Sequence, residues 1–84
     1  MLFELKLHLR GNNKMDYTVI LHNAEEGGYW AEVPALDGCF SQGETVEDTM
    51  LNIKEAIQSQ IIALEDEGKQ PPKDQIMILS HIAV

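Results

Sequence analysis

The chain has 84 residues, a length that suits one small domain with a modest core, and 44% of its residues are hydrophobic. Fourteen acidic residues against six basic ones give a formal net charge of −8, which argues against direct nucleic-acid binding by this chain and favours a basic partner. The sequence contains neither an apolar run of membrane-spanning length nor the pattern of a signal peptide, so a cytoplasmic protein is expected.

The first part of the chain predicts strands. Residues 2–10 alternate strictly between apolar and polar side chains, which is typical of a strand with one buried face. After a turn, residues 15–22 predict a second strand, and because it is apolar on most of both faces we expect it nearer the sheet centre. Residues 23–28 form a hydrophilic loop that ends in two glycines. Residues 29–33 then complete a hairpin with the second strand before Pro34 removes a ladder donor.

The stretch 34–48, PALDGCFSQGETVED, contains the chain's only cysteine. Gly38 and Gly43 bracket a segment long enough for one short further strand. Thr45 and Asp48 resemble a capping box, and acidic residues cluster where the positive end of a helix dipole would lie. A helix is therefore predicted to begin here.

The predicted helix carries an apolar seam at three- and four-residue steps, which should lie on the sheet. Leu51 and Ile62 fall off this seam, so they either widen the buried stripe or mark a surface for another subunit. Gly68 is the expected C-terminal cap, and residues 75–84 predict a last, largely buried strand. The fold class is therefore α+β, in the order strand, strand, strand, short strand, helix, strand, as one domain over 1–84. The seam consists of Val46, Met50, Ile53, Ile57, Ile61 and Leu64.

No catalytic or metal-binding set stands out in the sequence. Cys39 lies next to acidic residues that oppose thiolate formation, so we interpret it as a small core residue. His8, His22 and His81 fall in three different predicted strands without the close spacing of metal ligands. The carboxylates lie in loops or in a first helical turn, where solvation and capping account for them. We therefore expect no enzymatic activity, no metal and no cofactor.

The order of residues resembles the HicB family of antitoxins, also described as UPF0150-like proteins. The resemblance spans 16–72 and rests on YTVIL at 17–21, on EEGGYWAEVPALDGCFSQGETVEDTMLNIKEAI, and on EDEGKQPP. It implies an antiparallel-rich sheet with one long helix, similar to a truncated RNase H arrangement without the nuclease carboxylates. Relative to the shortest family pattern, 2–10 is an added N-terminal strand. The matched positions include Gly27, Gly28, Tyr29, Pro34, Leu36, Gly38, Cys39, Gln42, Gly43, Glu44, Thr45, Asn52, Glu55 and Ala56.

The resemblance implies an antitoxin of a type II toxin-antitoxin system that binds and neutralises a small basic HicA-like toxin, an RNA-cleaving protein. Many family members carry a C-terminal DNA-binding domain, and because this chain has no room for one after 75–84, operator binding by this chain alone is not expected. An alternative function is that of an orphan HicB-like oligomeric scaffold or small-ligand binder, and a homo-oligomer, dimer or tetramer, is expected under both. Candidates for toxin binding, chosen by charge or exposure, are Glu25, Glu26, Tyr29, Trp30, Asp37, Glu44 and Glu47.

Overall fold

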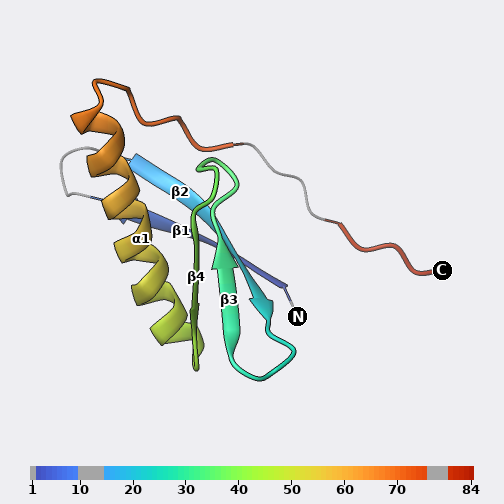
Figure 1. Cartoon of the computed structure of the whole chain (residues 1–84). Helices are drawn as coiled ribbons and strands as arrows, with labels where there is room; N and C mark the ends of the chain where they lie inside the picture. The colour runs from blue at the N-terminus through green and yellow to red at the C-terminus, as the bar shows by residue number, and fades with distance from the viewer. Residues whose placement is uncertain (1, 10–14, 76–79) are drawn as a thin grey trace.

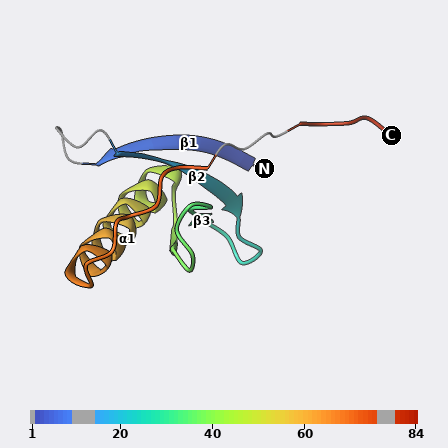
Figure 2. The ribbon, with the colours of Figure 1, turned by 90° about the horizontal axis from the view of Figure 1, so that it is seen from above.

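The protein is an α+β domain in which one helix packs on one face of a four-stranded antiparallel sheet with strand order β1-β2-β3-β4 (Figure 1). The computed structural model describes residues 2–9, 15–75 and 80–84, with side chains from residue 16 onward. The elements are β1 (Leu2–Leu9), β2 (Met15–Asn23), β3 (Tyr29–Glu32), β4 (Phe40–Gly43) and α1 (Val46–Asp66). Figure 2 shows α1 lying entirely on one side of the sheet. No helix in the described part of the chain is both long enough and apolar enough to cross a membrane.

The sheet confirms the four strands predicted in the first half of the sequence. β1 pairs with β2 along its whole length, from Leu2 opposite His22 to Leu9 opposite Met15. β2 in turn pairs with β3 over Ile20 to Asn23, so the predicted hairpin forms and β2 lies inside the sheet as its two apolar faces indicated. The likeness to a truncated RNase H arrangement stays a prediction.

The core lies between α1 and the face of the sheet that carries alternate residues of β2 and β3. Tyr17, Val19 and Leu21 of β2 are fully buried there, together with Ala31 of β3. Three isoleucines of the predicted helical seam are buried against them, and Val46 and Met50 are partly buried at its N-terminal end. Leu51 and Ile62 are 62% and 50% exposed, so they do not widen the buried stripe. The buried isoleucines are Ile53, Ile57 and Ile61.

Both predicted ends of the helix are confirmed. The Thr45 hydroxyl accepts a hydrogen bond from the Asp48 backbone N–H at 3.0 Å, which satisfies one of the unpaired donors of the first turn. At the other end Gly68 adopts a φ of +76°, and the backbone N–H groups of Gly68 and Lys69 donate to carbonyls of the last turn. This is the Schellman arrangement, which requires a residue that tolerates positive φ.

The segment after the helix runs back along β2. The Tyr17 hydroxyl donates to the carbonyl oxygen of Pro72, and Asp74 accepts two hydrogen bonds from Thr18, at 2.9 Å from the backbone N–H and at 2.7 Å from the hydroxyl. β3 pairs with β2 only from Asn23 to Ile20, so Tyr17 and Thr18 lie beyond the end of β3. The contacts with Pro72 and Asp74 occupy this remaining part of the β2 edge. Residues 72–74 are thereby fixed to the domain.

The sequence predicted a strand over 75–84, but the described residues at both ends of this segment form no strand. Residue 75 and residues 80–84 belong to no strand and are exposed, and 76–79 lie outside the described residues. Ile82 and Val84 are among the most exposed apolar side chains described. β2 already has β1 along one side and β3 with residues 72–74 along the other, so it offers no open side to this segment.

Candidate functional site

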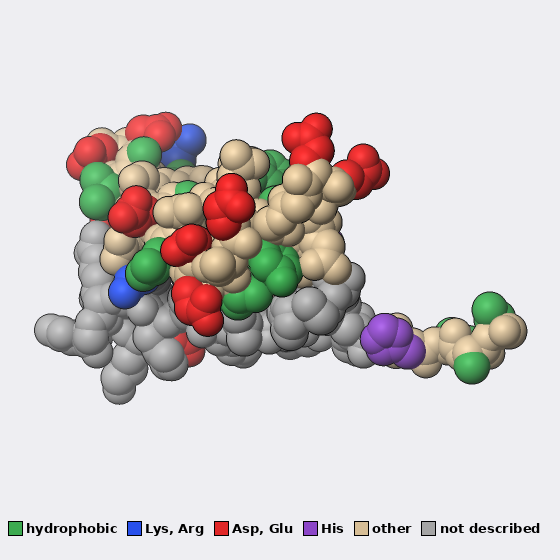
Figure 3. Space-filling view, turned by 90° about the horizontal axis from the view of Figure 1, so that it is seen from below, with side chains coloured by type: hydrophobic (Ala, Val, Ile, Leu, Met, Phe, Trp, Pro, Cys, Tyr) green, Lys and Arg blue, Asp and Glu red, His purple; other side chains and the backbone are tan. Residues whose placement is uncertain are grey.

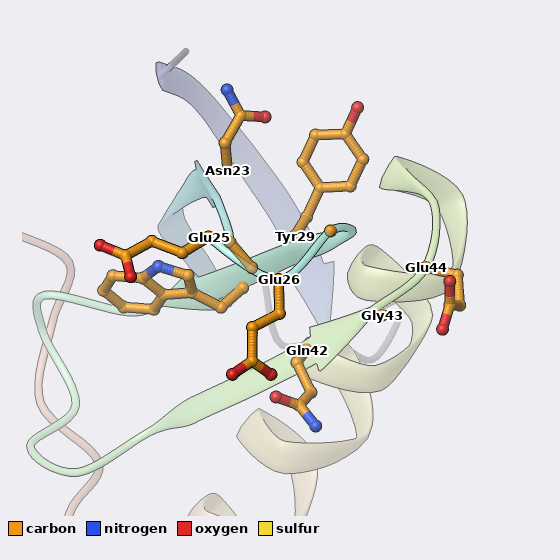
Figure 4. A pocket seen from close by; sticks show the side chains of 10 residues that line it. Asn23, Glu25, Glu26, Tyr29, Gln42, Gly43 and Glu44 are labelled. Carbon is orange, nitrogen blue, oxygen red and sulfur yellow. The ribbon is translucent and has the colours of Figure 1, made fainter.

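A hollow lies at the end of the sheet where the β2–β3 loop meets the end of β4 and the start of α1 (Figure 4). It is open to solvent and has a volume of about 810 Å³. Figure 3 views the molecule from below in the orientation of Figure 1, which is the end where this loop and the start of α1 lie, and shows many acidic side chains there. The lining residues are Asn23, Ala24, Glu25, Glu26, Gly27, Tyr29, Trp30, Gln42, Gly43 and Glu44.

The β2–β3 loop is held in a tight turn that presents two adjacent glutamates. The Gly27 N–H donates to the carbonyl of Ala24, and the Ala24 N–H donates to the carbonyl of Gly28. Gly27 and Gly28 have φ values of +101° and +74°, which side chains rarely allow. The two glycines that end the loop in the sequence are therefore needed for its path, and the path leaves Glu25 and Glu26 exposed.

Gly28 also brings the loop into close contact with β4. A Cβ atom built on Gly28 would lie 2.6 Å from the carbonyl oxygen of Gly43, closer than any ordinary contact. Gly43 in turn approaches the first turn of α1, where its own Cβ would lie 2.6 Å from the backbone nitrogen of Thr49. Because the loop, the end of β4 and the helix start touch through glycine backbones, the spacing between Glu26 and Glu44 is set by the main chain.

Five of the seven predicted binding residues come together around this hollow. Glu25, Glu26, Tyr29, Trp30 and Glu44 all line it, although they come from a loop, a strand and a helix entrance. In Figure 4 the Glu26 side chain points toward the side of Gln42, while the Tyr29 ring points the other way. The hollow therefore combines three carboxylates with two aromatic rings. This combination suits a cationic partner.

The other two predicted residues do not line the hollow. Asp37 is exposed in the β3–β4 connection at the far end of β3, where its backbone carbonyl accepts a hydrogen bond from the Gln60 side chain at 3.0 Å. Glu47 is exposed in the first turn of α1, close in sequence to Glu44 but outside the lining. Asn23 and Gln42 were missed by the sequence reasoning. The strand register, which pairs Trp30 with Gln42, is what brings them to this place.

A row of aromatic rings extends from this hollow across the sheet face that points away from α1. The His22 ring stacks on Trp30 with centroids 4.1 Å apart and an interplanar angle of 15°, and the Phe40 ring is tilted against Trp30 at 6.2 Å. His22 Nε2 also lies 2.7 Å from a carboxylate oxygen of Glu32. The sequence reasoning considered His22 only as a metal ligand and gave it no role, and the register places it directly opposite Trp30. We call His22, Trp30, Glu32 and Phe40 the aromatic face.

Cys39 is a core residue, as predicted. Its side chain is 3% exposed and packs in the cluster that includes Val33 and Leu36. Burial raises the pKa of the Cys39 thiol above its usual value, because the low-dielectric core disfavours the charged thiolate. At neutral pH this group is therefore a thiol and a poor nucleophile.

The three histidines of the chain do not form a common site in the described part of the structure. His22 belongs to the aromatic face and His81 is exposed in the C-terminal segment, while the His8 side chain lies outside the described ones. Among the described residues there is no cluster of three or more His, Cys, Asp or Glu side chains that could hold a metal ion.

Comparison with known proteins matches residues 17–82 to a family described as HicB-like antitoxins of bacterial toxin-antitoxin systems. A UPF0150 protein of Thermoplasma acidophilum is 47% identical over 60 residues, which cover 71% of this chain and 87% of the relative. A UPF0150 protein of Synechocystis is 43% identical over 63 residues, 75% of this chain and 80% of the relative. The matched residues include the β2–β3 loop, β4 and α1.

Proposed function

The chain belongs to the HicB-like antitoxin family, and on this premise we propose that it binds and neutralises a small basic HicA-like toxin that cleaves mRNA. The observation that carries the proposal is the hollow that Glu25, Glu26 and Glu44 line together with two aromatic side chains. It follows that this antitoxin acts by binding. It needs neither a cofactor nor chemistry of its own, and it does not contact nucleic acid directly.

Electrostatic attraction supports this choice of partner. The chain has a net charge of −8, and a toxin that grips RNA must present a basic surface to the phosphates. Complementary charges steer the two proteins together and raise the association rate, most strongly at low salt. An antitoxin that covers the basic surface of the toxin thereby excludes RNA from it.

Charge reversal in the β2–β3 loop tests the role of the hollow. We expect the double variant Glu25→Lys, Glu26→Lys to weaken toxin binding by about tenfold or more, mainly through a slower association rate. The matched control is Glu55→Lys, Asp66→Lys, which changes the net charge equally at exposed positions of α1. The measurements are association kinetics at low and high salt and the rescue of growth in cells that co-express a HicA-like toxin.

Three outcomes contradict this part of the proposal in different ways. If the unaltered chain neither binds nor neutralises the toxin, the antitoxin function is wrong. If the loop variant and the helix variant lose binding equally, net charge matters but the hollow does not. If neither variant changes the association rate, electrostatic steering plays no part.

A homo-oligomer, expected both for the antitoxin and for the alternative of an oligomeric scaffold without a toxin, is supported by exposed apolar side chains. Leu51 and Ile62 are exposed on α1 and, being eleven residues apart, lie about 20° apart around the helix axis. Ile82 and Val84 add exposed apolar area in the C-terminal segment. We infer that these residues support a homodimer, which light scattering on the purified chain tests directly. A stable oligomer with no affinity for a HicA-like toxin would favour the scaffold over the antitoxin.

A further inference from the structure

The aromatic face lies on the side of the sheet opposite the core. The register places His22 opposite Trp30 and Glu32 opposite Phe40, so these four side chains project from three neighbouring strands in the same direction. The core residues on the same strands, such as Ala31 and Leu21, project toward α1. The helix therefore shields the other face of the sheet (Figure 2).

This face leaves apolar side chains in contact with water. Phe40 is 59% exposed, although it is one of only two phenylalanines in the chain. Trp30 is partly exposed and is held in place by the stacked His22 ring and the tilted Phe40 ring. A pre-oriented tryptophan loses little conformational entropy on binding, which is the property of residues that dominate protein interfaces.

Carboxylates flank the aromatic rings. Glu32 belongs to the face itself, and Glu25 and Glu26 line the adjoining hollow with Trp30. The described basic side chains, Lys54, Lys69 and Lys73, lie on α1 and in the segment after it. Among the described side chains, the surface around Trp30 therefore combines aromatic rings with negative charge.

We propose that the aromatic face is the docking surface for the basic toxin, and that an arginine of the toxin packs against Trp30 while its guanidinium pairs with a neighbouring carboxylate. This inference rests on the proposed antitoxin function and adds the surface that is used. Arginine is the side chain that both stacks on aromatic rings and pairs with carboxylates in a fixed geometry. A second copy of this chain would bring its own charge of −8 against these carboxylates, and RNA would bring its phosphates, so both fit the surface less well.

Trp30 itself is the probe for the first experiment, because it is the only tryptophan in the chain. With a HicA-like toxin that has no tryptophan or carries Trp→Phe changes, all indole emission comes from this face. We expect toxin binding to shift the emission of Trp30 and to reduce its quenching by acrylamide at least about twofold, since the partner excludes solvent from the ring. Calorimetry on the same samples shows independently whether the complex forms.

A pair of variants forms the second experiment. We expect Phe40→Lys to weaken toxin binding by about tenfold or more, because it places a cation beside the docking arginine and removes an apolar contact. Ala63→Lys is the matched control: it adds the same charge at an exposed position of α1, so binding should stay within about twofold of the unaltered chain. Because both altered positions are well exposed, both variants should fold, which their urea unfolding curves check.

The outcomes separate this inference from the proposed function. If calorimetry shows toxin binding while Trp30 emission and quenching stay unchanged and Phe40→Lys binds normally, the antitoxin function stands and the docking surface is wrong. If the unaltered chain shows no toxin binding, both fail. If Trp30 becomes protected from acrylamide as the concentration of this chain alone is raised, a second copy covers the face and the inference is overturned.

Discussion

Replacing Gly28 by alanine tests whether the β2–β3 loop is locked onto β4. Gly28 has a φ of +74°, and an added Cβ would lie 2.6 Å from the carbonyl oxygen of Gly43. Gly38 provides a matched control, because its φ is +73° but an added Cβ would meet no atom within 4 Å. The two substitutions share the backbone strain and differ only in the close approach.

The magnitudes follow from these two terms. An alanine with left-handed φ costs about 1–2 kcal/mol, of which roughly 0.4–1 kcal/mol is offset by the lower entropy of the unfolded chain. Gly38→Ala should therefore lower the free energy of unfolding by about 1 kcal/mol. Gly28→Ala adds the cost of forcing two backbone segments apart, about 1–3 kcal/mol, for a total of about 2–4 kcal/mol. The whole domain should have roughly 4–13 kcal/mol of stability, so the Gly28 variant can remain folded.

Urea unfolding followed by Trp30 fluorescence measures both losses in the same buffer. The expected result is a lower transition midpoint for Gly28→Ala than for Gly38→Ala, with similar slopes. Equal losses for the two variants would refute the reasoning, since they would mean that the loop does not pack on Gly43. A loss confined to Gly38→Ala would refute it as well.

Two further predictions concern the segment after the helix. Asp74→Ala should lower the free energy of unfolding by about 2 kcal/mol because Thr18 loses two acceptors, whereas Asp74→Asn should cost about half as much; equal, negligible effects in urea unfolding would show that the segment is not fixed to β2. Burial and, secondarily, the Asp74 carboxylate raise the pKa of Tyr17, so the folded state holds this proton more tightly than the unfolded state. The resulting stability is complete below about pH 10 and is lost as pH rises through the folded-state pKa. Alkaline unfolding should therefore be shallower in Tyr17→Phe, and an identical pH profile for the two proteins would contradict this.

The secondary structure was predictable from local pattern. Strict alternation indicated β1, the acidic start with Thr45 indicated the N-terminus of α1, and Gly68 indicated its end. A short stretch of sequence is enough to predict these features, because they depend on the spacing of apolar side chains and on hydrogen bonds between residues close together in the chain. The strand expected over 75–84 is wrong at its described ends, which belong to no strand, because an apolar run in the sequence does not show whether another strand pairs with it.

The candidate site was predictable only in part. Charge and exposure selected Glu25, Glu26 and Glu44, which the hollow does bring together, but they also selected Asp37, which lies at the other end of β3. Acidic loops at the two opposite ends of β3 look alike in the sequence, so composition alone does not show which of them lies at the hollow. Which loops meet depends on the direction in which each strand crosses the sheet, and that is a property of the whole topology.

The sequence by itself determined the strands of the first half, the long capped helix, the core role of Cys39 and the likeness to an antitoxin family. Only the tertiary structure decided that His22, Trp30 and Phe40 form one aromatic row and that Pro72 and Asp74 are held against β2. The physical reason is that helices and turns are stabilised by neighbours a few residues apart. Cross-strand contacts instead depend on register, which is set once the hydrophobic face of every strand is buried on the same side.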